Sequence, residues 1–277
     1  MTTKATQRQK GEAFRKLHES GCFLIPNPWD AGSARMLENL GFPALATTSA
    51  GFAFGAGRAD GTMTQAETLA HMKAVSDVTD IPVSADYTNG FGETLDGVAE
   101  SFRLAAASGV VGASIEDTAT GASAPYEIAR AADRVRAAVE TVRTLDFTFT
   151  LTARAENFII GRRDLKDTIA RLQAYQEAGA DVLYAPGLLT EEEIVSVVRS
   201  VDRPVNVLAG IAGMDFTMSD FARMGVRRVS VGSGVARAAY TAFLAGAREM
   251  RDHGSFTYAK NALSMKQITA AIVEKSS

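Results

Sequence analysis

Cysteine and histidine are scarce in this sequence, and their scarcity limits the chemistry that it can support. The chain has 277 residues, with one cysteine and three histidines. Cys22 has no second cysteine to pair with, which excludes an internal disulfide and fits a reducing compartment, so we expect a cytoplasmic protein. His18, His71 and His253 fall within or at the end of segments with a helical pattern, which disfavours a zinc site built on histidine.

Long apolar runs and blocks of basic charge are also missing. No apolar run approaches the roughly 20 residues that a membrane-spanning helix needs, and residues 1–10 contain no apolar stretch typical of a secretory signal. The sequence has 29 basic and 32 acidic residues, for a net charge of −3. Without a basic block, we expect no nucleic-acid partner, and without an apolar run we expect no membrane association.

Eight short apolar segments alternate with longer segments of helical periodicity. The predicted strands are residues 22–26, 44–48, 81–86, 110–115, 147–153, 182–185, 204–208 and 226–231. The predicted helices are residues 6–20, 31–40, 64–79, 93–108, 126–145, 164–178, 190–201, 217–224, 235–252 and 258–274, and residues 49–63 are predicted to form a loop.

This alternation predicts the fold class. Strands that alternate with helices predict a parallel sheet, and eight such units in about 250 residues predict a closed (β/α)₈ TIM-type barrel. We expect one barrel domain over residues 1–277, with a C-terminal helical extension. The alternative is an open, doubly wound sheet, but no glycine-rich dinucleotide motif follows an early strand.

Polar residues gather where the predicted strands end. In a barrel these ends surround one mouth, where ligands bind. The residues at or just beyond them are Ser49, Ala50, Asp60, Asp86, Glu116, Asp117, Arg154, Glu156, Asn206, Ser230 and Gly232. Carboxylates that converge in a mouth repel one another unless a cation lies between them, and oxygen ligands suit Mg²⁺ or Mn²⁺.

Asp86 is the strongest single candidate for a metal ligand. It ends an apolar strand, and the turn Gly90-Phe91-Gly92 separates it from the next helix, so it is not simply a helix cap. For the other mouth residues, structural roles remain open. Glu116 can pair with Arg154, Asn206 can satisfy backbone groups, and Asp117 is expected to face outward or to cap a helix.

Several motifs in a fixed order resemble one enzyme family. They are Pro26-Asn27-Pro28-Trp29-Asp30-Ala31-Gly32-Ser33-Ala34-Arg35, Thr47-Thr48-Ser49-Ala50-Gly51, Gly57-Arg58-Ala59-Asp60-Gly61, the turn from Asp86 to Gly92, Ser114-Ile115-Glu116-Asp117 and Thr152-Ala153-Arg154-Ala155-Glu156. With these motifs the chain resembles the isocitrate lyase / phosphoenolpyruvate mutase superfamily over about residues 14–243. The resemblance implies a (β/α)₈ barrel whose last helix packs on a partner subunit, in a homodimer or homotetramer.

The resemblance also implies a Mg²⁺ or Mn²⁺ cofactor and a small 2-oxo or 2-hydroxy acid as substrate. By position it implies that Asp86 binds the metal directly, and that Asp60 and Glu116 hold metal-bound waters. It assigns the cradle of a substrate carboxylate to Ser49 with the backbone of Ala50 and Gly51. Arg154 takes the place of a bidentate carboxylate clamp, and Asn206 is a further candidate for substrate binding.

Two departures from the family bear on the reaction. Many members carry a second acidic residue two positions after the first, where this chain has Thr88. The family's lyases carry a cysteine, and its phosphonopyruvate enzymes a lysine and an asparagine, in the segment that is Thr118 to Pro125 here and contains none of these. Methylisocitrate lyase activity is therefore not expected.

Three functions remain open from the sequence. The first is a metal-dependent lyase that breaks a carbon–carbon bond of a 2-oxo or 2-hydroxy dicarboxylate through an enolate, by decarboxylation or retro-aldol cleavage. The others are a phosphonopyruvate mutase or hydrolase and a non-catalytic dicarboxylate-binding barrel. For the lyase, the expected catalytic residues are Arg154, Glu116 and Tyr87, and Tyr184 is a second candidate proton carrier.

Overall fold

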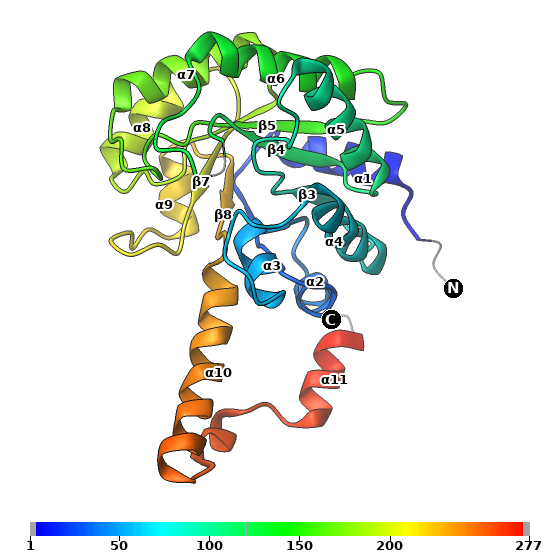
Figure 1. Cartoon of the computed structure of the whole chain (residues 1–277), viewed down its shortest axis with the longest axis vertical. Coiled ribbons are helices and arrows are strands. Elements are labelled where there is room, and N and C mark those ends of the chain that lie inside the picture. Colours follow the sequence, from blue (N-terminus) through cyan, green and yellow to red (C-terminus); the bar gives the residue numbers. More distant parts are fainter. Residues whose placement is uncertain (1–3, 120, 274–277) are drawn as a thin grey trace.

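Eight parallel strands form a barrel at the centre of the molecule (Figure 1). The computed structural model describes residues 4–119 and 121–273. The strands are β1 (Phe23–Ile25), β2 (Leu45–Ala46), β3 (Val83–Ala85), β4 (Gly112–Glu116), β5 (Thr150–Arg154), β6 (Val182–Tyr184), β7 (Val205–Leu208) and β8 (Arg228–Ser230). Their order is β1-β8-β7-β6-β5-β4-β3-β2, all parallel, which confirms the predicted (β/α)₈ barrel.

The barrel closes between β1 and β2 through hydrogen bonds. The Ala46 amide donates to the Pro26 carbonyl at 3.1 Å. The Asn27 side chain donates to the Thr47 carbonyl at 3.0 Å and accepts from the amides of Val231 and Gly232 at 2.9 Å each. One amide side chain therefore ties the ends of β1, β2 and β8 together at the mouth.

Helices follow the strands around the barrel, in close agreement with the sequence pattern. They are α1 (Gln7–Leu17), α2 (Ala31–Asn39), α3 (Ser49–Gly55), α4 (Gln65–Val78), α5 (Leu95–Ala107), α6 (Ile128–Val142), α7 (Leu165–Glu177), α8 (Glu191–Arg199), α9 (Met218–Arg223), α10 (Gly234–His253), the 3₁₀ helix η1 (Thr257–Asn261) and α11 (Met265–Val273). Capping boxes begin α4 at Thr64 with Glu67 and α8 at Thr190 with Glu193, because each glutamate satisfies the amide of its N-cap residue.

Two predicted elements were wrong. The expected loop 49–63 begins with the helix α3, which Thr48 caps by accepting from the Gly51 amide. Residues 258–274 were expected to form one helix, but Ser264 accepts from the Gln267 amide and starts α11 separately from η1. Both errors have one cause. A polar side chain that caps a helix can start that helix where the apolar pattern is weak, as in α3, or where the pattern continues without a break, as before α11. Residue 274 lies outside the described part of the chain.

Helix α1 covers the end of the barrel opposite the mouth. Phe14 is fully buried there, and a side chain at Gly112 of β4 would come within 3.0 Å of the Phe14 ring. His18, at the end of α1, packs edge-on against Phe14 and Phe23. The main apolar core lies between the strands and the surrounding helices, so the inside of the barrel is free to be polar.

The C-terminal part of the chain forms an arm that leaves the barrel. In Figure 1, α10 projects away from β8, and α11 returns to lie beside α2. The Asn39 side chain donates to the carbonyls of Ala271 and Ile272 at 3.0 and 2.8 Å. Large apolar side chains of this arm are exposed, including Phe243 at 67% and Met265 at 82%. The packing of this arm on a partner subunit stays a prediction.

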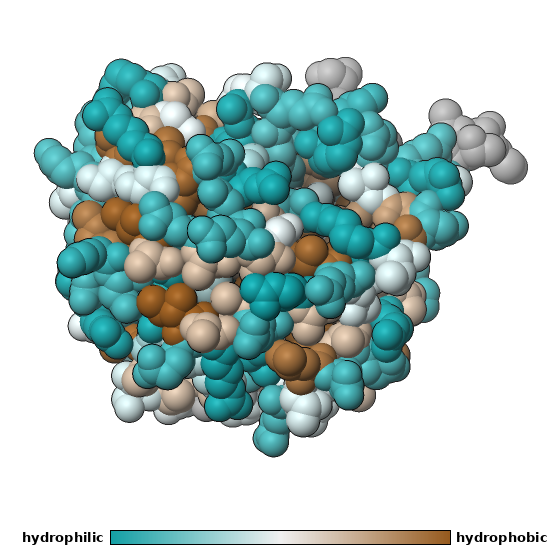
Figure 2. All heavy atoms as spheres, turned by 90° about the horizontal axis from the view of Figure 1, so that it is seen from above, coloured by the Kyte–Doolittle hydropathy of each residue, from teal (hydrophilic) through white to brown (hydrophobic). Residues whose placement is uncertain are grey.

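The outer surface is mixed in character. On the face shown in Figure 2, hydrophobic patches are separated by hydrophilic side chains. Within residues 4–119 and 121–273, no helix combines the length and the apolar character that crossing a membrane requires.

Candidate active site

The mouth of the barrel opens into a cavity of about 470 Å³. Side chains from the ends of several strands and from the loops beyond them line it. From the predicted set these are Ser49, Ala50, Asp60, Asp86, Glu116, Arg154, Glu156, Asn206, Ser230 and Gly232. The residues that the strand-end argument grouped therefore share one cavity, because parallel strands in a closed barrel present their carboxyl ends to one opening.

Asp86 is held in place by a tight turn. Its amide donates to Thr47 Oγ1 at 2.9 Å, and its Oδ2 accepts from the Ser49 amide at 2.9 Å. A side chain at Gly92 would come within 2.2 Å of the Gly97 and Val98 backbone, so only glycine fits there. Thr88 has a φ of 46°, in the left-handed region that a β-branched residue rarely adopts, which makes this turn locally strained.

Arg154 contacts three of the carboxylates of the cavity. Its Nη1 donates to Asp86 Oδ1 at 2.8 Å and lies 3.0 Å from Glu116 Oε1, and its Nε donates to Glu156 Oε1 at 2.8 Å. The guanidinium also lies 5.0 Å from the centre of the Tyr184 ring. One cation thus contacts three carboxylates, and Asp60 adds a fourth to the cavity wall.

The local charge is therefore strongly negative, and the pKa values reflect it. Burial raises the pKa of Glu116 well above its ordinary value, Arg154 offsets only part of that rise, and the charges of Glu156, Asp86 and Asp60 add to it. The pKa of Glu156 is raised, mainly by burial. Asp60 is exposed as a whole, but its carboxyl is partly shielded from solvent. This shielding raises the pKa of Asp60, and repulsion from Asp86 raises it further.

A hard divalent cation fits this set of donors. Arg154 is the one cation paired with these carboxylates, and a further positive charge placed among them would relieve the repulsion that remains. Among the described residues, no three acidic, histidine or cysteine side chains converge closely enough to enclose an ion by themselves. Mg²⁺ commonly keeps several waters and binds through one or two carboxylates together with its substrate, which suits such an open arrangement.

The expected carboxylate cradle is brought together only in part. Ser49 and Ala50, at the start of α3, line the cavity. Gly51 does not; it is buried, and its amide donates to Thr48 Oγ1 at 3.2 Å. Asn206 is 1% exposed and lines the cavity, with its side chain donating to Ser230 Oγ at 3.0 Å.

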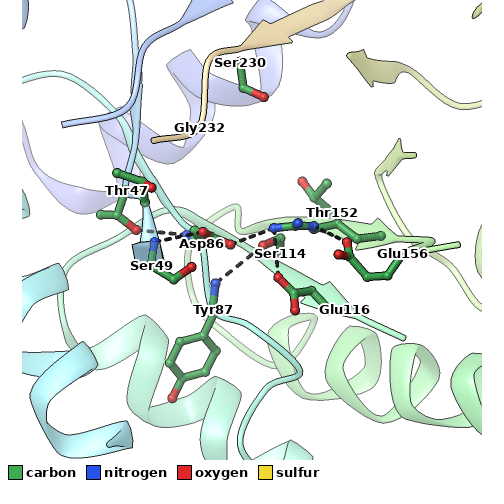
Figure 3. Close-up of polar contacts among 12 residues, drawn as sticks. Thr47, Ser49, Asp86, Tyr87, Ser114, Glu116, Thr152, Glu156, Ser230 and Gly232 are labelled. Carbon is green, nitrogen blue, oxygen red and sulfur yellow. Dashed lines mark hydrogen bonds and ion pairs between the residues drawn. The ribbon is translucent and has the colours of Figure 1, made fainter. Parts of the chain in front are cut away.

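Tyr87 and Asp117 lie on the opposite side of the sheet from the cavity. Tyr87 is fully buried, and its hydroxyl contacts Ser101 and Gln65 in the helical layer; Figure 3 shows its ring pointing away from Asp86. The expectation that Tyr87 carries a proton to the substrate therefore does not match its position. Successive residues of a strand point to opposite faces, so Asp86 and Tyr87 cannot both face the mouth.

The same alternation turns Asp117 away from the mouth, as expected, and toward the helical layer. It is 4% exposed and accepts from Tyr175 OH at 2.6 Å and from Arg171 Nη1 at 3.2 Å, both on α7. Its other oxygen accepts from the Glu156 amide at 2.9 Å. Asp117 therefore fixes the backbone that carries Glu156, behind the cavity wall.

Three residues of the cavity had no assigned role in the sequence. Glu156 pairs with Arg154, and the i, i+2 spacing that puts both on one face of the strand was the available signal. Thr47 orients Asp86. Arg228 lines the cavity from the start of β8; a charged residue inside an apolar strand segment was its only signal in the sequence.

Fold and site together define a (β/α)₈ barrel with carboxylates gathered around one arginine at its mouth. The chain belongs to the phosphoenolpyruvate phosphomutase family, whose family model matches residues 14–251. This confirms the resemblance to the isocitrate lyase / phosphoenolpyruvate mutase superfamily and the enzyme class that the resemblance implied.

Two proteins that are similar in sequence align with most of this chain. An uncharacterized protein of Mycobacterium tuberculosis (strain CDC 1551 / Oshkosh) is 30% identical over 80% of this chain and 82% of its own length. The oxaloacetate decarboxylase of Bradyrhizobium sp. (strain ORS 278) is 28% identical over 82% of this chain and 78% of its own length.

Solved structures show the same barrel. A Burkholderia cenocepacia J2315 protein, assigned only provisionally as a lyase/mutase, is 50% identical and has a TM-score of 0.94, with coverage of 98% of this chain and 99% of that chain. A phosphonopyruvate hydrolase in complex with oxalate and Mg²⁺ is 25% identical with a TM-score of 0.82, covering 95% and 94% of the two chains.

Proposed function

We propose that the protein is a Mg²⁺- or Mn²⁺-dependent lyase that breaks a carbon–carbon bond of a small 2-oxo or 2-hydroxy dicarboxylate. The observation that carries the proposal is the contact of Arg154 with Asp86, Glu116 and Glu156 in a cavity at the mouth of the barrel. The family membership supports it, since relatives include an oxaloacetate decarboxylase and a structure that holds oxalate with Mg²⁺.

In this proposal each residue has a role that its position allows. Asp86 would hold the metal directly, in place of part of its ion pair with Arg154, and Asp60 and Glu116 would hold the waters bound to that metal. When bound, the metal polarises the 2-oxo group beside the bond that breaks. Arg154 then binds the substrate carboxylate and stabilises the negative charge that develops as the bond to C3 breaks. Ser49 and Ala50 provide the wall against which that carboxylate lies.

Tyr184 is the better placed candidate for a proton carrier. It lines the cavity, and burial raises the pKa of its hydroxyl to about 12, so it is neutral and can donate at neutral pH. Among the described residues, the cavity wall contains no lysine, cysteine or histidine. The candidate sources of the proton that replaces the group lost from C3 are the Tyr184 hydroxyl, the Glu116 carboxyl, whose pKa burial raises, and water.

A panel of 2-oxo and 2-hydroxy acids, assayed for release of pyruvate with and without Mg²⁺, tests the proposal. We expect oxaloacetate or a substituted malate to be turned over, chelation of the metal to stop turnover, and Asp86→Ala to abolish it. Asp146→Ala, on an exposed loop far from the mouth, is the matched control and should keep full activity. If no acid yields product while one still raises the melting temperature, the protein binds dicarboxylates without cleaving them.

A further inference from the structure

The cavity contains a second arginine, Arg228, which has a different environment from Arg154. It enters from the first residue of β8, lines the cavity and is 5% exposed. Its Nε donates to Asn206 Oδ1 at 2.9 Å and its Nη2 to Thr152 Oγ1 at 2.9 Å, and its Nη1 lies 3.5 Å from His18 Nε2. These three partners are an amide, a hydroxyl and an imidazole, so Arg228 is held in place by neutral groups.

The imidazole is neutral in this arrangement. His18 Nδ1 lies 2.8 Å from the Phe14 carbonyl, which can only accept, so Nδ1 carries the proton and Nε2 presents its lone pair to Arg228. Burial, and then the charge of Arg228, lowers the pKa of His18 to about 3. His18 therefore adds no charge that could balance or oppose an incoming group at neutral pH.

No carboxylate balances the charge of Arg228 within the part of the chain that the structure describes. Arg154 has three ion-pair partners, whereas the ion pairs among residues 4–119 and 121–273 include none with Arg228. A buried cation without a counter-charge is costly, and burial accordingly lowers the pKa of Arg228 to about 10. A guanidinium has five N–H donors, and three partners leave two of them for another acceptor.

Neighbouring hydroxyl and amide groups extend this cationic region across the cavity wall. Asn206 donates to Ser230 Oγ at 3.0 Å, and the Ser230 side chain partly offsets the rise that burial causes in the pKa of the Tyr184 hydroxyl. The Tyr184 ring in turn lies against Arg154. All of these side chains line the same cavity, and in strand order Tyr184 on β6 comes between Arg154 on β5 and Arg228 with Ser230 on β8.

The spacing of the two arginines suits the two ends of a short ligand. Thr152, which holds Arg228, precedes Arg154 by two residues on the same face of β5, and two strand residues span about 6.6 Å. The Arg228 guanidinium therefore contacts β5 about one side-chain repeat before the residue that carries the Arg154 guanidinium. A dicarboxylate with a few carbons between its acid groups bridges such a step.

We propose that Arg228, with Ser230 and Asn206, forms a second anion subsite that binds the distal carboxylate of the substrate, the one that does not lie with Asp86 and Arg154. This inference rests on the proposed function and makes it more specific, because it assigns the choice of a dicarboxylate over a monocarboxylate to Arg228. The bound carboxylate supplies the counter-charge that Arg228 lacks, and the neutral tyrosine between the arginines stays close to the reacting carbons.

Three acids test the subsite without requiring turnover. Malate and lactate share the 2-hydroxy acid end, and only malate carries a distal carboxylate; oxalate occupies the first end alone. With Mg²⁺ present, calorimetric titration should show that the wild-type protein binds malate more tightly than lactate. Arg228→Met should reduce this preference by about 10- to 100-fold, as expected for a charged hydrogen bond, and should leave oxalate binding unchanged.

The matched control is Arg227→Met. Arg227 is the neighbouring arginine of the sequence, is half-buried, and bonds to the Gly21 carbonyl at the opposite end of the barrel from the mouth. It should keep the wild-type preference. If Arg228→Met does not fold, Arg228→Gln removes the charge while keeping a hydrogen-bonding side chain of moderate length, and the same loss of preference is expected.

The outcomes separate this inference from the proposed function. Loss of the malate preference in the Arg228 variants, with oxalate binding intact, supports the subsite even if no acid is cleaved. If the wild-type protein turns over oxaloacetate and Arg228→Met keeps the preference for malate over lactate, the lyase proposal is supported and the subsite proposal is wrong. A wild-type protein that binds malate and lactate equally, or an Arg228→Met variant that weakens oxalate and malate by the same factor, also overturns it.

Discussion

Asp117 shows how one buried carboxylate can support a site without touching a ligand. It joins β4 to Arg171 and Tyr175 of α7 and to the amide of Glu156. Asp117→Ala should lower the free energy of unfolding by about 3 kcal/mol, because it leaves buried donors unpaired, although Asp167 still pairs with Arg171. Urea unfolding measures the change. Asp133→Ala, on the exposed side of α6, is the control, and a loss no larger than that of the control would contradict this role.

His18 makes stability depend on pH. Its pKa is lowered from 6.5 to about 3 by burial and then by Arg228. The unfolded chain therefore binds more protons than the folded chain between these values, so stability is full above about pH 6.5 and falls as the pH drops toward 3. Between pH 7 and pH 5 this one group should cost about 2 kcal/mol.

The measurement that isolates this effect is the free energy of unfolding at several pH values for the wild type and for His18→Gln. The variant should lose about 2 kcal/mol less than the wild type between pH 7 and pH 5. His71, whose pKa burial lowers to about 4, contributes in the same direction in both proteins and cancels in the comparison. Parallel pH curves for the two proteins would show that His18 is not held neutral in the folded state.

Single residues differ in how far the sequence determined their roles. Asp86, Glu116 and Arg154 could be placed at the mouth because each ends a predicted strand, and the structure brings them together. Tyr87 was misjudged because it directly follows a mouth residue, and the alternation of a strand turns it toward the helices, as it does Asp117. Arg228 could not be assigned, because its lack of an acidic partner is a property of packing.

At the scale of elements, the turn after β3 stores strain at the site. Thr88 has a φ of 46° and its carbonyl accepts from the Glu116 amide at 2.8 Å, so the turn positions both Asp86 and Glu116. Asparagine tolerates the left-handed region better than a β-branched residue. Thr88→Asn should therefore raise the free energy of unfolding by about 1 kcal/mol.

Chemical denaturation of Thr88→Asn beside Thr144→Asn checks this expectation. Thr144 is exposed at the end of α6 and has no positive φ, so its replacement should change stability little. A decrease in stability for Thr88→Asn would mean that the threonine side chain contributes more than its backbone conformation costs.

Elements with strong local signals agreed best between sequence and structure. The capping boxes at Thr64 and Thr190 mark the starts of α4 and α8. Helix α3 was missed because its seven residues are mostly glycine, alanine and phenylalanine with no helical period, and Thr48 alone starts it. A short helix of this kind is stabilised by its place between the strand end and the barrel wall rather than by its own sequence.

For the whole molecule, the exposed apolar arm bears on assembly. Phe243 and Leu244 on α10 and Phe256 beyond it are large apolar side chains left in solvent. We expect the protein to form a homodimer or homotetramer that covers them, and Phe243→Glu to weaken that assembly. Light scattering after size-exclusion chromatography measures the mass. Arg248→Ala on the same helix should leave it unchanged, and a monomeric wild type would contradict the expectation.

The sequence by itself determined the order of strands and helices, the barrel class and the group of carboxylates with one arginine at its mouth. These follow from local periodicity and from the rule that parallel strands present their carboxyl ends to one side. Only the tertiary structure decided which neighbours share a face, that one arginine contacts three carboxylates, and that Arg228 lies buried among neutral groups. Such features depend on side chains that are distant in the chain and meet only when the barrel closes.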